Sequence, residues 1–147
     1  MSSQDSYQGA MPLKIEDFTD SLWAISRQII DRTQDAKLTF RGRCKVSGGW
    51  YQETGQILLP NGQTLSSTRR YRWDATSAGV DVYFDDGRFF HWIDLAHTAP
   101  KARHFCDPDS YAVSYKFTQW PVWTSLWTVK GPRKDYEMQS SYRKPTL

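Results

Sequence analysis

The sequence has few cysteines and histidines and no long hydrophobic run. Two cysteines, Cys44 and Cys106, are too few for a disulfide framework, and we predict that they are not bonded to one another. The first residues, MSSQDSYQGAMPLKIEDF, have neither a basic start nor an apolar run, which argues against a secretory signal or a membrane span. These absences predict a cytoplasmic protein with no membrane partner.

The excess of positive over negative charge is also small, since the formal net charge is only +3. This value falls well short of the basic stripe that nucleic-acid binders carry, although the run STRRYR beside Trp73 resembles a stacking platform. We therefore expect no nucleic-acid partner.

Aromatic side chains, by contrast, are abundant at 15% of the chain. Large flat side chains of this kind fill β-barrels and sandwiches or line apolar pockets. A chain of 147 residues is long enough for one sizeable core and too short for two. We predict a disordered tail over residues 1–12, which are rich in Ser and Gln, followed by one domain over residues 13–147.

From residue 37 onward, alternating segments are separated by turn residues. Asn61-Gly62 is the strongest hairpin signal, and DDG at 85–87 and GP at 131–132 mark further turns. About nine strands follow in this order, with no helix-length segment between them for parallel crossovers. The pattern predicts an all-β, antiparallel, up-and-down meander that either folds as two sheets or closes into a barrel, and closure removes the exposed strand edges.

Residues 15–31 fit two patterns. Apolar residues recur at spacings of three and four, as in an amphipathic helix, and this pattern is slightly favoured. Trp23, Ile25, Arg27 and Ile29 also alternate with smaller or polar residues, as in a strand.

Several motifs between residues 18 and 144 resemble an uncharacterised family of small lipocalin-like domains that is grouped with the calycin barrels. They include LWAISRQI, TRRYRW, FDDGRFFHWIDL, HFCDPDSYAVSYKF and WTVKGPRKDYEMQSSYR. The resemblance implies a single barrel of about nine or ten strands. It makes residues 21–31 the first strand and residues 14–20 a short helical plug across one end. It implies a cavity but no reaction, because fold alone does not supply function.

In a strand, side chains of one parity point to the same face, so the inward rows of the barrel can be proposed. Arg27, Arg69 and Lys134 each share an inward row with aromatic residues. A buried cation needs a partner, and inward carboxylates are scarce in these strands, which favours an anionic ligand group held by Arg27 and Arg69. The residues that we expect to be mostly buried are Trp23, Phe40, Tyr71, Phe84, Tyr115, Phe117 and Tyr136.

The run RHFCDPDSYAVSYKF raises the question of a metal or thiol site. His104 and Cys106 share a face, with His91 as a third candidate ligand, but no Cys-x-x-Cys or His-x-x-x-His pair supports a metal, and we expect none. As a nucleophile, Cys106 would need His91 or His104 within reach to act as a base. The simpler interpretation is that Cys106 is a small buried side chain without a chemical role. The pocket candidates are Arg27, Arg69, Tyr71, Trp73, His91, His104, Cys106, Tyr111, Tyr115, Lys134 and Tyr136.

For the strand at residues 122–130, the pattern does not decide which row of side chains faces the barrel interior. Trp123 and Trp127 share one face, and an outward orientation would make them a candidate homodimer surface.

The leading hypothesis is a barrel that binds a small, partly apolar molecule with an anionic or strongly polar group, without a cofactor. One alternative is a small acid/base enzyme, isomerase-like or hydrolase-like, that uses His91 or His104 with a tyrosine or cysteine. Another is a structural or partner-binding module whose barrel is filled by side chains.

Overall fold

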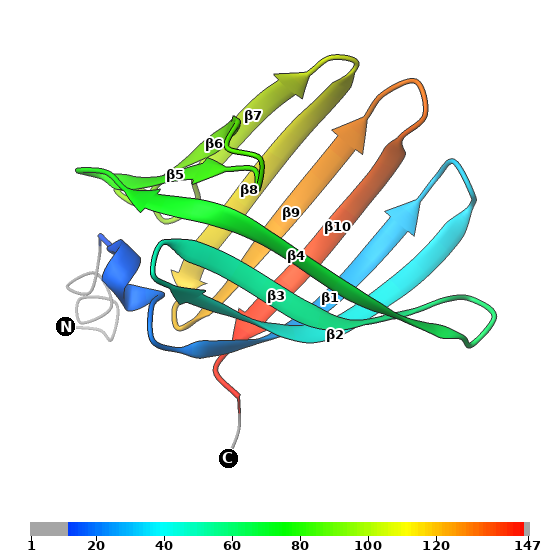
Figure 1. Cartoon of the computed structure of the whole chain (residues 1–147), viewed down its shortest axis with the longest axis horizontal. Helices are drawn as coiled ribbons and strands as arrows, with labels where there is room; N and C mark the ends of the chain where they lie inside the picture. Colours follow the sequence, from blue (N-terminus) through cyan, green and yellow to red (C-terminus); the bar gives the residue numbers. More distant parts are fainter. Residues whose placement is uncertain (1–11, 146–147) are drawn as a thin grey trace.

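The computed structural model describes residues 12–145, which form one antiparallel sheet of ten strands that curls into a nearly closed barrel (Figure 1). The strands are β1 (Leu22–Asp31), β2 (Ala36–Ser47), β3 (Trp50–Leu58), β4 (Thr64–Ala75), β5 (Gly79–Tyr83), β6 (Phe89–Asp94), β7 (Lys101–Cys106), β8 (Asp109–Gln119), β9 (Val122–Lys130) and β10 (Asp135–Arg143). The predicted all-β barrel is confirmed. The tail expected over residues 1–12 lies outside the described residues, except for Pro12.

Strands that follow one another in the sequence are neighbours in the sheet, except for β6 and β7. The strand order is β6-β5-β4-β3-β2-β1-β10-β9-β8-β7, so the first strand pairs with the last, and β6 and β7 form the two edges. Local turns set this meander. At the predicted Asn61-Gly62 hairpin, Gly62 has a φ of 89°, a conformation that costs glycine little because it has no Cβ.

The first strand begins at Leu22, which settles the ambiguity of residues 15–31 in favour of the strand. Before it lies a single 3₁₀ turn, η1 (Ile15–Asp17), in place of the longer helical plug that we expected. Phe18 follows this turn with a relative exposure of 1%, and its carbonyl accepts a 3.0 Å hydrogen bond from the Trp23 indole. The Phe18 ring also packs edge-on against Trp73, Phe117, Trp120 and Trp123. The segment therefore plugs one end of the barrel.

Of the seven residues that we expected to be mostly buried, four are buried and three are partly buried. Trp23, Phe40, Tyr115 and Phe117 are buried. Tyr71, Phe84 and Tyr136 are only partly buried, and all three line the cavity of the barrel.

The tryptophan row of β9 faces inward. Trp123 is buried and Trp127 is partly buried, whereas Leu126 of the other row is exposed. The homodimer surface that we considered for the outward case is therefore not formed by these two tryptophans.

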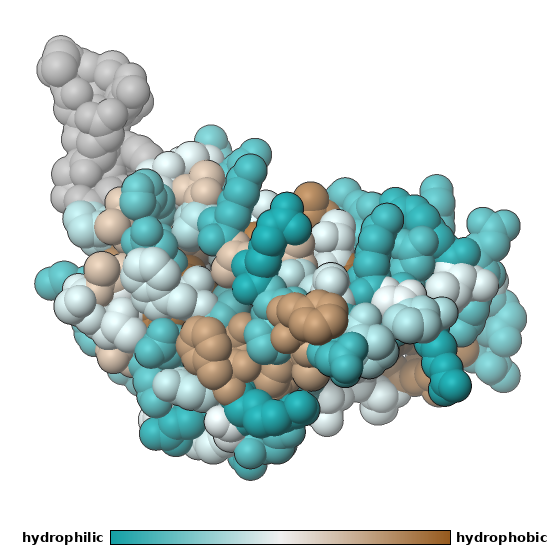
Figure 2. All heavy atoms as spheres, turned by 90° about the horizontal axis from the view of Figure 1, so that it is seen from above, coloured by the Kyte–Doolittle hydropathy of each residue, from teal (hydrophilic) through white to brown (hydrophobic). Residues whose placement is uncertain are grey.

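Seen from above, the exterior is mostly hydrophilic, and the hydrophobic residues that reach this face lie mainly near its middle (Figure 2). Among residues 12–145, no helix is both long enough and apolar enough to cross a membrane.

Candidate functional site

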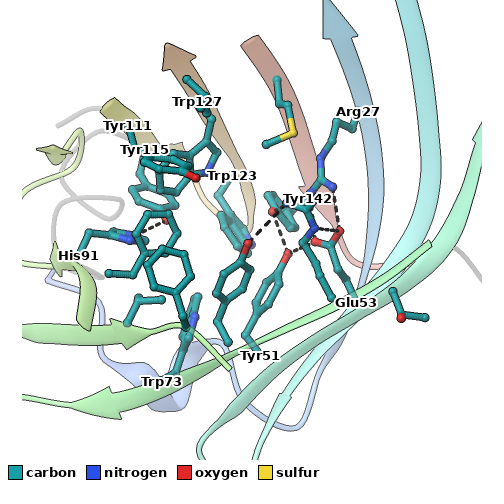
Figure 3. A pocket seen from close by; sticks show the side chains of 18 of the residues that line it. Arg27, Tyr51, Glu53, Trp73, His91, Tyr111, Tyr115, Trp123, Trp127 and Tyr142 are labelled. Carbon is teal, nitrogen blue, oxygen red and sulfur yellow. Dashed lines mark hydrogen bonds and ion pairs between the residues drawn. The ribbon is translucent and has the colours of Figure 1, made fainter. Parts of the chain in front are cut away.

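The barrel encloses a cavity of about 380 Å³ with mostly aromatic walls (Figure 3). The aromatic lining consists of Tyr51, Tyr71, Trp73, Phe84, Phe90, Tyr111, Tyr115, Trp123, Trp127, Tyr136 and Tyr142. Several of these rings stack in pairs, such as Tyr51 on Trp73, with ring centroids 5.4 Å apart and planes at 16°. The ring faces make the cavity suitable for a flat apolar group.

Most of the predicted pocket residues line this cavity. They are Arg27, Arg69, Tyr71, Trp73, His91, Tyr111, Tyr115 and Tyr136. They come from β1, β4, β6, β8 and β10, so strand alternation correctly predicted their direction.

Three predicted residues, His104, Cys106 and Lys134, are not part of the cavity lining. The His104 ring packs against the Phe84 and Phe90 rings, which line the cavity, with ring centroids 5.7 and 5.5 Å apart. Lys134 precedes β10, where strand alternation does not apply, and its Nζ pairs with Asp109 at 2.9 Å.

Cys106 lies at the end of β7, where its Sγ accepts a hydrogen bond from Arg88 Nη1 at 3.7 Å. Cys106 and Cys44 are both free thiols in this structure. Within residues 12–145, no group of three His, Cys, Asp or Glu side chains is placed to hold a metal ion.

The Arg27 guanidinium already has a carboxylate partner in Glu53, which corrects our expectation that a ligand is needed to supply one because inward carboxylates are scarce. Arg27 Nη1 and Nη2 donate to the two Glu53 carboxylate oxygens at 2.8 and 3.0 Å, and Arg27 Nε donates to Ser140 Oγ at 2.6 Å. Both charged residues are buried. The two parallel bonds neutralise Arg27, so it has no charge left for a ligand.

Two tyrosines extend this ion pair into a buried network. The Tyr51 hydroxyl donates to Glu53 Oε1 at 2.5 Å and lies 2.9 Å from the Tyr142 hydroxyl. Burial opposes ionisation of Glu53, but the hydrogen bonds and charge of Arg27 outweigh it and lower the pKa of that carboxyl. Burial, helped by the Glu53 charge, raises the pKa of the nearby Cys44 thiol to about 12.

Sequence reasoning missed Tyr51, Glu53, Ser140 and Tyr142. A signal for two of them was present, because Tyr51 and Glu53 share the inward parity of Gly55 and Ile57 on one strand. Glu53 was therefore an inward carboxylate that alternation alone places in the barrel.

Arg69 lies at the rim of the cavity, with 43% of its side chain exposed. Its Nη1 donates to the Tyr71 hydroxyl at 3.4 Å, and its Nε is 4.0 Å from Glu53 Oε2. This second contact is long and goes to a carboxylate that Arg27 already occupies.

The opposite wall carries a buried histidine. His91 Nε2 lies 2.9 Å from the Tyr115 hydroxyl, and only 3% of the residue is exposed. Burial, together with the nearby His104, lowers the pKa of His91 to about 3, so its ring is neutral near pH 7. His91 Nδ1 and the indole Nε1 of Trp123 are buried and have no hydrogen-bond partner in the part of the chain that the structure describes.

A ten-stranded meander around an aromatic cavity defines a small lipocalin-like barrel. The chain belongs to DUF6314, a family of unknown function whose sequence pattern matches residues 20–144. This membership confirms the resemblance inferred from the motifs.

Among solved structures, the S-type phycobiliprotein lyase from Guillardia theta has a similar fold, with a TM-score of 0.55. The match covers 100% of this chain and 94% of the lyase at 7% sequence identity, so the likeness concerns the fold alone. No curated protein sequence matches the chain.

Proposed function

We propose that the protein binds a small, partly apolar molecule with an acidic group inside its barrel. The observation that carries this proposal is the aromatic cavity of about 380 Å³, whose lining includes His91 and Trp123, each with a buried ring nitrogen that has no hydrogen-bond partner among residues 12–145. This volume lies within the range of about 300 to 1,000 Å³ that ligand pockets occupy. Trp73 and Tyr115 are available for the apolar part of the ligand, and Arg69 at the rim is available for the acidic group.

The two alternative functions have less support. A structural barrel filled by side chains would leave no such cavity. An acid/base enzyme would need a base whose pKa is near the working pH, whereas the pKa of His91 is lowered to about 3. The fold likeness to a phycobiliprotein lyase assigns no reaction to this chain, because one fold hosts many unrelated functions.

Native mass spectrometry of gently purified protein tests the proposal. We expect a retained small molecule whose mass limits its chemistry. The variant Val129→Phe, which projects a ring into the cavity from β9, should lose this molecule and remain folded. Leu126→Phe on the exposed face of the same strand is the matched control and should retain it. Equal retention by both variants would place the molecule elsewhere and contradict the proposal.

A further inference from the structure

The charges around the cavity do not cancel. Among the described residues, its lining contains two guanidinium groups, Arg27 and Arg69, and one carboxylate, Glu53. His91 is neutral near pH 7, since its pKa is lowered to about 3. One positive charge therefore remains, and a ligand with a single negative charge compensates it.

The remaining positive charge is at the open end of the cavity. Arg27 is neutralised by its two short bonds to Glu53, whereas Arg69 makes only the 4.0 Å contact to that carboxylate. Arg69 is also 43% exposed, so an acidic group bound there keeps part of its contact with water. Full desolvation of a carboxylate is unfavourable, which makes the rim the better place for it.

The plugged end of the cavity offers a hydrogen-bond donor instead. Trp123 is 1% exposed and packs on the plug residue Phe18, with ring centroids 5.3 Å apart. Its ring is stacked on Tyr142 at 3.7 Å and 2°, which fixes the orientation of the indole (Figure 3). The indole nitrogen is a donor only, and it has no acceptor among the described residues.

His91 contributes a second donor. If Tyr115 donates its hydroxyl hydrogen to His91 Nε2, the imidazole proton lies on Nδ1, and this single donor is unpaired. The other tautomer leaves both the Tyr115 hydroxyl hydrogen and the Nδ1 lone pair without a partner among residues 12–145. The first arrangement has fewer buried unsatisfied groups and is preferred.

We infer that the ligand is a flat monoanion with a hydrogen-bond acceptor, such as a ketone oxygen, at the end of its ring system opposite to the acidic group. The acid pairs with Arg69 at the rim, the rings lie between the aromatic walls, and the acceptor takes the indole hydrogen of Trp123 or the Nδ1 hydrogen of His91. This inference rests on the proposed binding function and adds the polarity of the ligand and its direction in the cavity.

Calorimetric titration with three matched probes tests it. The first probe, 6-acetyl-2-naphthoate, has an acid at one end and a ketone at the other. The second, 6-isopropenyl-2-naphthoate, replaces the ketone oxygen by a methylene group of the same shape. The third, 6-acetyl-2-naphthamide, replaces the acid by a neutral amide. We expect the first probe to bind about tenfold more tightly than either of the others, since each lost interaction removes one well-placed hydrogen bond or charge contact.

Two variants assign the preferences to residues. Trp123→Phe should reduce the preference for the acetyl over the isopropenyl probe, and Arg69→Gln should reduce the preference for the acid over the amide. Trp92→Phe and Arg70→Gln are the controls, because Trp92 is exposed on β6 and Arg70 is paired with Asp85 away from the cavity lining. Both controls should keep both preferences.

The outcomes separate the two proposals. Equal affinity for the acetyl and isopropenyl probes, or for the acid and the amide, would overturn the inference and leave the binding function intact. A ketone preference that survives in Trp123→Phe and in His91→Phe would also overturn it. Binding of none of the three probes would contradict the proposed function together with the inference.

Discussion

Arg27 and Glu53 form a bidentate ion pair inside the barrel, with N–O distances of 2.8 and 3.0 Å. Arg27 projects from β1 and Glu53 from β3, and β2 separates the two strands in the sheet. The Arg27 guanidinium also stacks over Phe40 of β2 at 4.8 Å from the ring centroid. The pair therefore ties together three neighbouring strands on the inner face of the barrel.

Breaking this pair should be costly for folding. We expect Arg27→Met or Glu53→Gln to lower the free energy of unfolding by about 3 to 5 kcal/mol, because each change leaves an uncompensated buried charge. The double variant Arg27→Met/Glu53→Leu should lose less than the sum of the single changes. Urea unfolding measures all three. The exposed pair of Arg32 and Glu137 is the control, and Arg32→Gln should change stability little.

Stability should fall as the solution is acidified, and His91 should cause the first part of the loss. Its pKa is about 3 in the folded protein against the ordinary 6.5, because burial disfavours the imidazolium. Between these values the unfolded chain binds a proton that the folded protein does not, so the free energy of unfolding decreases by roughly 3 kcal/mol from pH 6.5 to pH 4.

Urea unfolding at several pH values checks this expectation. His91→Gln should flatten the slope above pH 4.5. The Glu53 carboxyl has a lowered pKa, so its contribution is present above its ordinary pKa and is lost only at lower pH, as the folded form is protonated. An unchanged slope in His91→Gln would refute the assignment.

Two facing glycines should not tolerate a side chain. Gly42 and Gly55 are register partners on β2 and β3, and a Cβ on either would lie 2.6 Å from Phe40 Cζ and against the neighbouring backbone. Gly42→Ala and Gly55→Ala should each destabilise the fold by about 1 to 3 kcal/mol, as overpacking does. Thr54→Ala on the exposed face of β3 is the control for the shift in the urea midpoint. A neutral Gly55→Ala would show that Phe40 can move aside.

The two thiols should react differently in the native protein. Cys44 is 1% exposed and its pKa is raised to about 12 by burial, so it presents almost no thiolate at pH 8. Cys106 is partly exposed at the end of β7. Iodoacetamide followed by peptide mass spectrometry should find Cys106 modified before Cys44, and denaturation should abolish the difference. Equal modification of both thiols in the native protein would contradict the burial of Cys44.

Local patterns in the sequence determined much of the fold. The Asn61-Gly62 turn, the alternation of the strands and the scarcity of helix-length segments are properties of short stretches, and they predicted the antiparallel meander. Alternation also directed Arg27, Trp73 and Tyr115 inward, because the side-chain period of a strand is two whatever its neighbours are. The resemblance to the family placed the first strand, which the pattern alone left ambiguous.

Only the tertiary structure decided which inward groups meet. Parity gives the face of a residue but not its register, and register depends on pairing between strands that are far apart in sequence. In the barrel, Arg27 is opposite Phe40, while Glu53 is opposite Cys44, so the ion pair is a diagonal contact that the long arginine side chain spans. Lys134 was wrongly assigned to an inward row, since it lies in the turn before β10, where strand alternation does not apply. Whether a buried charge is paired, and which charge is left for a ligand, therefore depends on contacts across strands, which no single stretch of sequence contains.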